Sequence, residues 1–398
     1  ELAQVDVRWR NKVAAGAQES DHVRVEIETP DGPYQVTCDW LLACDGARST
    51  VRGLVGAAFI GETFEDQFLI ADVKMTAAFP TERWFWFDPP FHAGQSALLH
   101  KQPDDVWRID LQLGPEADAE TERQPARVRQ RVARMIGHDD FALEWVSVYR
   151  FQCRRMQRFV HDRVIFAGDA AHQVSPFGAR GCNSGIEDAE NLAWKLDLVL
   201  KGGAGASLLA SYDTERIAAA DENIAASTRS TDFIAPHTAY ERLLRNAALA
   251  LARTAPFARR LVNAGRLSTP SIYDTPLSTP DCDRWTAGPR PGASMPDAPL
   301  IDAQRRSLHL TDAFKAAGCG FTLLTFDAPF LSGLPDAVQR IDIGASGLHD
   351  PDGLCAKRYG AQPGSAFLLR PDGYVAARFK QPSSEAILAA HTRAQGTT

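Results

Sequence analysis

The sequence lacks a surplus of basic residues, a long apolar run and paired cysteines. It has 43 Lys and Arg against 50 Asp and Glu, a net charge of −7. This argues against a nucleic-acid or anionic-membrane binder, because such proteins present a basic surface. No segment approaches the roughly 18 apolar residues of a membrane helix. The seven cysteines are scattered without a CxxC pair, so we expect no disulfide framework, no metal site and a reducing, cytoplasmic location.

Common catalytic motifs are also absent. The sequence has no GxSxG, HExxH or Walker loop, so these hydrolase, zinc-protease and P-loop templates find no support, and catalytic residues stay unassigned. Apolar residues make up 44% of the chain and charged residues 23%, which is typical of folded globular proteins. At roughly 150 residues per domain, the length predicts two or three domains.

Alternating apolar and polar residues predict strands near the N-terminus. The alternation runs over 5–9, 23–27 and 34–36, and it continues into the apolar segment 40–44. We expect a small antiparallel meander in which 40–44 is the most deeply buried strand. Aromatic-rich alternation from about 59 to 150 predicts a separate sheet.

Helices and strands are expected in turn along the rest of the chain. A polar helix over roughly 120–136 interrupts the aromatic sheet, and the apolar strand 164–167 precedes a long helical region. The expected apolar face of its first helix consists of Ile186, Ala189, Leu192, Ala193, Leu196 and Val199. More helix is expected over about 206–266, followed by a linker rich in Pro, Ser, Thr and Asp. Later strands are expected at 321–326, 339–343, 366–370 and 374–379.

The first candidate site follows the apolar run 40–44. Asp45 and Gly46 stand where the carboxyl end of a strand would meet a ligand. Gly46 allows a ligand to approach the backbone, and Asp45 can accept hydrogen bonds from ribose or ribityl hydroxyls. Ser49 can cap the next turn. By itself, the Asp-Gly pair is equally typical of a plain turn, with Arg52 in solvent.

The second candidate site follows strand 164–167. Gly168 and Asp169 end the strand, and a loop rich in Pro and Gly leads from Pro176 into a helix that begins near Asn183. Glycines at 178, 181 and 185 would let backbone N–H groups face a bound ring. The positive end of the helix dipole would suit a group that becomes anionic.

Three further side chains in this segment have alternative roles. His172 could act as a base, but packing beneath the loop is the role we expect. Cys182 stands at a helix start, which lowers a thiol pKa, yet it has no partner in the sequence and we expect it to pack. Arg180 is the charged side chain placed to approach a ligand, or else it points to solvent.

Together, the two segments resemble the single-component FAD-dependent aromatic monooxygenases. The resemblance rests on Asp45-Gly46 with Ser49 to Arg52, on Gly168 to His172, and on the Pro-x-Gly-x-x-Gly-x-Asn run from Pro176. It is strongest toward the 3-(3-hydroxyphenyl)propionate hydroxylases, where it continues through 191–196 and 211–216. The similarity covers essentially the whole chain.

The resemblance implies a cofactor site and its residues. Asp169 would hydrogen-bond the ribityl chain of FAD, and Asp45 would lie near the pyrophosphate and the nicotinamide nucleotide. The loop from Pro176 to Asn183 would line the flavin ring. The implied cofactor-binding residues are Asp45, Gly46, Ser49, Arg52, Gly168, Asp169, Ala170, Pro176, Gly178, Ala179, Arg180, Gly181, Cys182 and Asn183.

One part of the family pattern is missing from this sequence. Family members begin with a strand, a GxGxxG turn and a helix that cradle the pyrophosphate. The fingerprint is absent, and the chain begins with Glu1 in place of Met. We expect a missing N-terminal part on the order of a hundred residues, containing the first βαβ unit. As written, the chain would bind FAD poorly.

The implied fold is of the α/β (α+β) class. A Rossmann-like FAD-binding domain, truncated at its N-terminus, would span 1–56 and 153–266, where it is joined by a helical region. A β-sheet substrate domain would be inserted over 57–152, and a linker would cover 267–299. A thioredoxin-like domain would span 300–398, but Cys319 and Cys355 form no CxxC, so a structural or dimer-forming role is expected there.

The implied function is hydroxylation of a small phenolic or aromatic substrate. NAD(P)H and O2 would be the co-substrates, and oxygen would transfer from a flavin C4a-hydroperoxide. Neither nucleic acid nor membrane is expected as a partner, and a homodimer is expected. Two alternatives stay open: a polyketide-tailoring epoxidase or Baeyer–Villiger oxygenase of the same fold, and a truncated non-catalytic relative.

Overall fold

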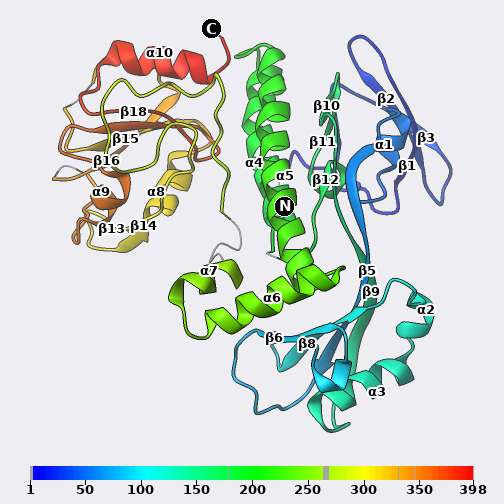
Figure 1. The fold of residues 1–398 in the computed structure, drawn as a ribbon. Coiled ribbons are helices and arrows are strands. Elements are labelled where there is room, and N and C mark those ends of the chain that lie inside the picture. The colour runs from blue at the N-terminus through cyan, green and yellow to red at the C-terminus, as the bar shows by residue number, and fades with distance from the viewer. Residues whose placement is uncertain (1–2, 178, 263–268, 330, 346, 398) are drawn as a thin grey trace.

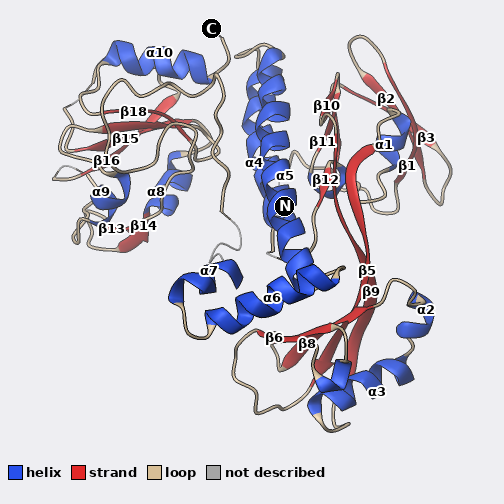
Figure 2. Cartoon of the chain, viewed as in Figure 1, coloured by secondary structure: helices blue, strands red, loops and turns tan. Residues whose placement is uncertain are grey.

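A pair of long helices stands between a C-terminal strand-rich region and the strands of the N-terminal half (Figure 1). The structure is a computed structural model that describes residues 3–177, 179–262, 269–329, 331–345 and 347–397. The two helices are α4 (Gly181–Leu200) and α5 (Ser207–Ile234). Figure 2 shows the strands gathered on either side of this pair and below it.

The N-terminal meander is a three-stranded antiparallel sheet. Its strands are β1 (Lys12–Gln18), β2 (Val23–Glu28) and β3 (Tyr34–Cys38). The predicted first strand at 5–9 is wrong, because β2 pairs with 12–18 instead. Trp9 is 83% exposed, so its alternation with polar neighbours does not reflect a buried face. A short helix, α1 (Thr50–Leu54), packs on β1.

The predicted last strand of the meander belongs to a different sheet. β4 (Leu41–Ala43) pairs in parallel with β11 (Val164–Phe166), and β11 pairs in turn with β10 (Val160–His161). β4 is an edge strand among the described residues. Its burial was overestimated from sequence, because Leu42 is 43% exposed. This parallel pair is what positions the candidate site.

The aromatic segment forms a six-stranded sheet, in the order β12-β9-β5-β8-β7-β6. Its strands are β5 (Phe59–Lys74), β6 (Trp84–Phe87), β7 (Ser96–Lys101), β8 (Val106–Leu113), β9 (Ala142–Met156) and β12 (His172–Gln173). β5 and β9 are long and run from the lower sheet toward the region of β10 and β11 (Figure 1). The expected helix at 120–136 is divided into α2 (Ala119–Glu122) and α3 (Pro125–Ile136), because Pro125 starts a new helix.

The buried face of α4 differs from the predicted one. Leu192 and Leu196 are buried as expected, but Ile186 is 55% exposed and Ala189 and Ala193 are exposed. The helix instead buries several polar side chains, among them Ser184, Asp188, Asn191 and Lys195. Helical periodicity counts apolar residues only, so it passed over a face stabilised by ion pairs.

Beyond α5 the chain crosses to the C-terminal unit. The expected helix over 206–266 is broken into α5, α6 (Ala239–Ala252) and α7 (Arg259–Val262). Residues 269–298 contain no helix or strand. The remaining elements are β13 (Pro299–Ile301), β14 (Ser307–His309), α8 (Leu310–Ala317), β15 (Phe321–Phe326), β16 (Val338–Ile343), α9 (Leu354–Tyr359), β17 (Ala366–Leu369), β18 (Val375–Phe379) and α10 (Ser384–Ala394).

The C-terminal sheet has the order β16-β15-β17-β18, with β15 and β16 parallel and the other pairs antiparallel. Its four strands confirm the four predicted from sequence. Leu208 of α5 and Trp194 of α4 pack into this unit, whereas Leu196 and Tyr212 pack against β11 and β2 on the other side. The α/β class is therefore confirmed. The domain boundaries given above remain predictions.

Candidate functional site

Both predicted acidic segments end at the same edge of one sheet. Parallel pairing aligns Phe166 of β11 with Ala43 of β4. Asp45 and Asp169 follow these strands at similar distances, and the side chains of both are exposed. Since carboxyl ends of parallel strands form the usual ligand edge of an α/β sheet, tertiary pairing brings together what the sequence separates by more than 120 residues.

The loop after β4 uses two of its predicted residues to start α1. The Asp45 carboxylate accepts a hydrogen bond from Val51 N at 3.1 Å. Ser49 is the N-cap of α1, and its hydroxyl accepts from Arg52 N at 2.9 Å. Gly46 has a φ of 79°, and a side chain there would point into open space. The glycine therefore adopts the positive φ that the turn requires, and it leaves the backbone open to a ligand.

Arg52 ties the two strand-end loops together. Its guanidinium donates to the carbonyl of Ala47 at 2.9 Å and to that of Ala170 at 3.0 Å. The same group lies 3.8 Å from the ring centroid of Phe59. Burial and the nearby Arg154 lower the pKa of Arg52. Arg52 thus holds the shape of the edge through backbone contacts.

In the loop after β11, the side chain of Asp169 is left available. Gly168 has a φ of 60°, and its N–H donates to Asp188 Oδ2 at 2.8 Å. Ala170 is buried. The Asp169 carboxylate is exposed and has no hydrogen-bond partner within the described ranges of the chain. The turn is therefore fixed by its backbone while the carboxylate remains free to bind a ligand.

The loop from Pro176 connects this edge with the aromatic sheet. Phe177 packs on Phe68 and Phe151 of the sheet, with ring centroids 5.2 and 5.3 Å away. Ala179 has a φ of 53°, and its N–H donates to the Pro176 carbonyl at 3.1 Å. Gly178, also predicted to bind the cofactor, lies outside the described residues.

Two other predicted loop residues hold the loop in place. Arg180 donates from Nη1 to Asn223 Oδ1 on α5 at 2.8 Å. Asn183 donates from Nδ2 to the carbonyl of Ala179 at 2.7 Å. Both side chains therefore bind protein groups, so their contribution to a ligand site would come through the backbone they position.

The N-terminus of α4 points its backbone donors toward the same loop. Its N-cap is Arg180, which makes no side-chain capping bond, and the first turn holds no acidic residue. Among the described residues, a side chain at Gly181 would contact Val174 alone, at 3.5 Å. Cys182 is exposed, so the expectation that it packs is wrong. An uncapped N-terminus of a 20-residue helix favours an anionic ligand group.

Behind this edge lies a buried carboxylate that the sequence reasoning missed. Asp188 accepts hydrogen bonds from Gly168 N at 2.8 Å, His172 Nε2 at 2.6 Å and Arg216 Nε at 2.6 Å. Burial opposes ionisation, but His172 and Arg216 lower the pKa of Asp188 to about 2. His172 is 2% exposed, which confirms that it packs beneath the loop.

A second buried ionic cluster joins α4 and α5 to the C-terminal unit. Glu215 binds Lys195 at 2.7 Å and Arg370 at 2.7 Å, all with fully buried side chains. Burial lowers the pKa of Lys195 to about 8. Arg370 also pairs with Asp372, which accepts from the Trp194 indole at 3.0 Å. One signal was available in sequence: charged residues placed among apolar ones at helical spacing.

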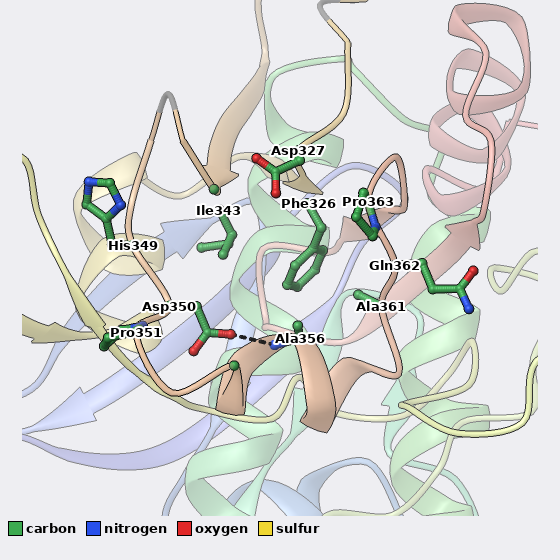
Figure 3. Close-up of a pocket in the computed structure, with 12 residues that line it drawn as sticks. Phe326, Asp327, Ile343, His349, Asp350, Pro351, Ala356, Ala361, Gln362 and Pro363 are labelled. Carbon is green, nitrogen blue, oxygen red and sulfur yellow. Dashed lines mark hydrogen bonds between the residues drawn. The ribbon is translucent and has the colours of Figure 1, made fainter.

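The C-terminal unit has a pocket of its own (Figure 3). It has a volume of about 330 Å³ and lies at the carboxyl ends of β15 and β16, where Phe326 and Ile343 line it. Asp350 accepts from Ala356 N at 2.9 Å, the dashed line in Figure 3. Cys355 is buried, and burial raises the pKa of its thiol to about 12. Cys319 is exposed and not bonded to it, so the unit offers no dithiol pair.

The described residues include neither a metal-ligand group nor a membrane-spanning helix. No group of three or more His, Cys, Asp or Glu in them is arranged to hold a metal ion. None of the helices they form has the length and apolar character needed to cross a membrane.

The comparison with family models follows the division seen in the fold. A model described as "FAD binding domain" matches residues 1–227, and one described as "Aromatic-ring hydroxylase, C-terminal" matches residues 288–397. The chain belongs to the FAD-dependent aromatic monooxygenases. The family predicted from sequence is therefore confirmed, and FAD is the cofactor that its binding domain takes.

The names of individual relatives give different substrates. The chain is 31% identical to the 6-methylpretetramide 4-monooxygenase of Streptomyces rimosus, over 97% of this chain and 72% of that protein. It is 28% identical to a 3-(3-hydroxy-phenyl)propionate/3-hydroxycinnamic acid hydroxylase of Escherichia coli, over 93% of this chain and 70% of that protein. It resembles the crystal structure of the flavin-dependent monooxygenase PieE with FAD and substrate, at a TM-score of 0.80 and 25% identity, over 98% and 76%.

The residues at the strand edge fit an FAD. The exposed Asp169 carboxylate can accept from a ribityl hydroxyl, the open backbone at Gly46 permits close approach, and the uncapped start of α4 suits an anionic ring. Asp45 and Ser49 already bind backbone N–H groups. Which of the predicted residues touch the cofactor remains a prediction.

Proposed function

We propose that this family member hydroxylates a phenolic ring, using NAD(P)H and O2. The observation that carries the proposal is the position of the Pro176 loop. One end of the loop leads into the uncapped N-terminus of α4, beside the strand edge, and Phe177 packs on the aromatic face of the six-stranded sheet. A ring bound between the edge and the sheet would meet both.

The chain's own residues would bind and orient the reactants. Asp169 would hold the ribityl chain, and the first N–H groups of α4 would face the edge of the flavin ring that becomes negative on reduction. When bound, FAD supplies electron transfer from NAD(P)H and the activation of O2. Phe68, Phe151 and Phe177 would exclude water from the substrate side.

The substrate class follows from the relatives that the chain resembles. One relative acts by name on 6-methylpretetramide, and another on 3-(3-hydroxy-phenyl)propionate. The second name describes a hydroxylated aromatic ring, so we propose a phenol as the substrate class. The homodimer and the cytoplasmic location expected from sequence stay predictions, the first of which sedimentation equilibrium of the FAD-loaded protein would test.

The test is NAD(P)H oxidation by the protein supplied with saturating FAD, against a panel of single-ring and fused-ring phenols. At least one phenol should accelerate oxidation, and mass spectrometry should find one added oxygen atom as a new ring hydroxyl. An epoxide or an inserted ester oxygen would instead support the same-fold alternatives. Failure of any phenol to stimulate oxidation in FAD-loaded protein would refute the proposal and favour a non-catalytic relative.

A further inference from the structure

Asp110 is a buried carboxyl group in the middle of the six-stranded sheet. β8 lies between β5 and β7, and the strand register places Asp110 between Ile70 and Leu98. The residue is 8% exposed. Its Oδ1 atom is buried without a hydrogen-bond partner in the part of the chain that the structure describes. An unsatisfied buried acceptor destabilises a fold, so folding alone does not explain this residue.

The side chain lies on the face of the sheet that meets the Pro176 loop. Side chains alternate between faces along a strand. The neighbouring Ile109 and Leu111 pack in the core under α3, so Asp110 lies on the opposite face. Two residues before Ile70 on β5, Phe68 occupies that opposite face and contacts Phe177 of the loop. Asp110 is therefore one pleat repeat, about 7 Å, from the loop contact.

Charged groups lie near Asp110, but the nearest cation on its own strand is already paired. Arg108 donates to both oxygens of Asp72, at 2.8 and 2.7 Å. Burial raises the pKa of Asp110 to about 6, against the opposing effect of Arg83 and Arg108. His100 on β7, two residues from Leu98, also lies on this face, and burial lowers its pKa.

We propose that Asp110 accepts a hydrogen bond from a hydroxyl group of the aromatic substrate and so selects hydroxylated rings. This inference rests on the proposed function. A hydroxyl group suits the site because it is a neutral donor, whereas a substrate carboxylate at the same place would face the Asp110 carboxylate. Ile70, which pairs with Asp110 from β5, is partly exposed and offers apolar surface for the ring itself.

The inference separates binding from stability. Replacing an unsatisfied buried polar group by an apolar one of similar size is neutral or stabilising. Asp110→Leu should therefore fold at least as well as the wild type, and its transition in urea should lie at the same or a higher concentration. A loss of substrate binding in this variant would then not be a loss of fold.

The experiment uses two ligands that differ only at the hydroxyl group. These are a phenol that the FAD-loaded wild type hydroxylates and the methyl ether of the same phenol. Asp110→Leu should weaken binding of the phenol by about 10- to 100-fold, the value of a charge-assisted hydrogen bond, and change binding of the ether by less than about twofold. Binding is followed by tryptophan fluorescence, and KM should rise more than kcat falls.

A pH series adds a second reading. Binding of the phenol by the wild type should strengthen as the pH rises through about 6, because the ionised carboxylate is the better acceptor. Asp110→Asn should remove this dependence. Asp72, Arg83 and Arg108 are the charged groups that act on Asp110. His100→Gln, which should keep the dependence, controls for the histidine on the same face. Asp139→Asn removes an exposed carboxylate of the same region and should change nothing.

The outcomes distinguish the two proposals. Suppose that the wild type hydroxylates the phenol. If Asp110→Leu then weakens binding of the phenol and of the ether equally, or weakens binding of neither, Asp110 does not bind the hydroxyl group. If the wild type, loaded with FAD, hydroxylates no phenol, the proposed function fails, and the role of Asp110 fails with it.

Discussion

The strand edge and the interior behind it use acidic residues in opposite ways. Asp45 and Asp169 at the edge are exposed, and Asp169 has no hydrogen-bond partner among the described residues. Asp188 and Glu215, one layer inside, are fully buried and each binds three or more donors. Both layers contact the same turn at Gly168, because Asp188 accepts from its N–H.

This difference indicates which carboxylates can bind a ligand and which hold the fold in position. A carboxylate whose partners are all protein groups has no capacity left for a ligand, and its removal leaves buried cations uncompensated. A carboxylate without partners contributes little to stability but can bind a hydroxyl group. The comparison predicts that substitutions of the buried carboxylates will lower the free energy of unfolding. Substitutions of the exposed carboxylates at the strand edge will lower the affinity for FAD.

The largest effect is expected for Asp188→Ala. The variant removes the closer and fully buried ion-pair partner of Arg216 and leaves Gly168 N without an acceptor, which costs about 3–5 kcal/mol of unfolding free energy. Urea denaturation followed by circular dichroism measures this. Glu187→Ala serves as the control, because Glu187 is partly exposed and binds the same Arg216 at 3.2 Å. A loss below 1 kcal/mol in Asp188→Ala would contradict the assignment.

A smaller effect, on a different quantity, is expected for Asp169→Ala. Loss of one charge-assisted hydrogen bond should weaken FAD binding by about 1.5–3 kcal/mol, with unfolding free energy changed by less than about 0.5 kcal/mol. Titration of FAD fluorescence measures the affinity. Asp327→Ala, at the end of the parallel strand β15 in the C-terminal unit, should leave FAD affinity unchanged. Unaltered FAD binding by Asp169→Ala would remove Asp169 from the site.

The pH dependence of stability should also distinguish the interior from the edge. In the fold, the pKa of Asp188 is about 2, below the ordinary value of about 3.9 for an aspartate in an unfolded chain. The ionised form therefore stabilises the fold above pH 4, and this contribution of about 2 kcal/mol is lost as the pH falls from 4 to 2. Denaturation at a series of pH values should show that Asp188→Asn lacks this part of the decline. Equal slopes in both proteins would refute the ion pair.

The smallest effect is expected in the C-terminal unit. Cys355 is buried and Cys319 exposed, and they are not bonded to each other. The double variant Cys319→Ser, Cys355→Ala should therefore keep the hydroxylation rate of the wild type within about twofold, because no dithiol pair is lost. Loss of activity in a variant that still unfolds cooperatively would reveal a redox role for this unit.

Much of the fold was readable from local pattern. The four C-terminal strands match runs of apolar residues, and the aromatic alternation after residue 59 became the six-stranded sheet. Two of the errors share one cause. Residues 5–9 alternate as a strand would, and Ile186 lies on an apolar helical face, yet both are exposed, because periodicity reports a possible face and not whether anything packs on it.

The sequence by itself determined the family, the cofactor class and the two acidic segments, because Asp-Gly and Gly-Asp pairs beside strands are local features of the chain. Only the tertiary structure decided what each carboxylate does. Parallel pairing of β4 and β11 brought Asp45 and Asp169 to one edge, and the packing of α4 on α5 enclosed Asp188 with Arg216. Burial and partner number set the energy of a charge, and both depend on residues distant in sequence.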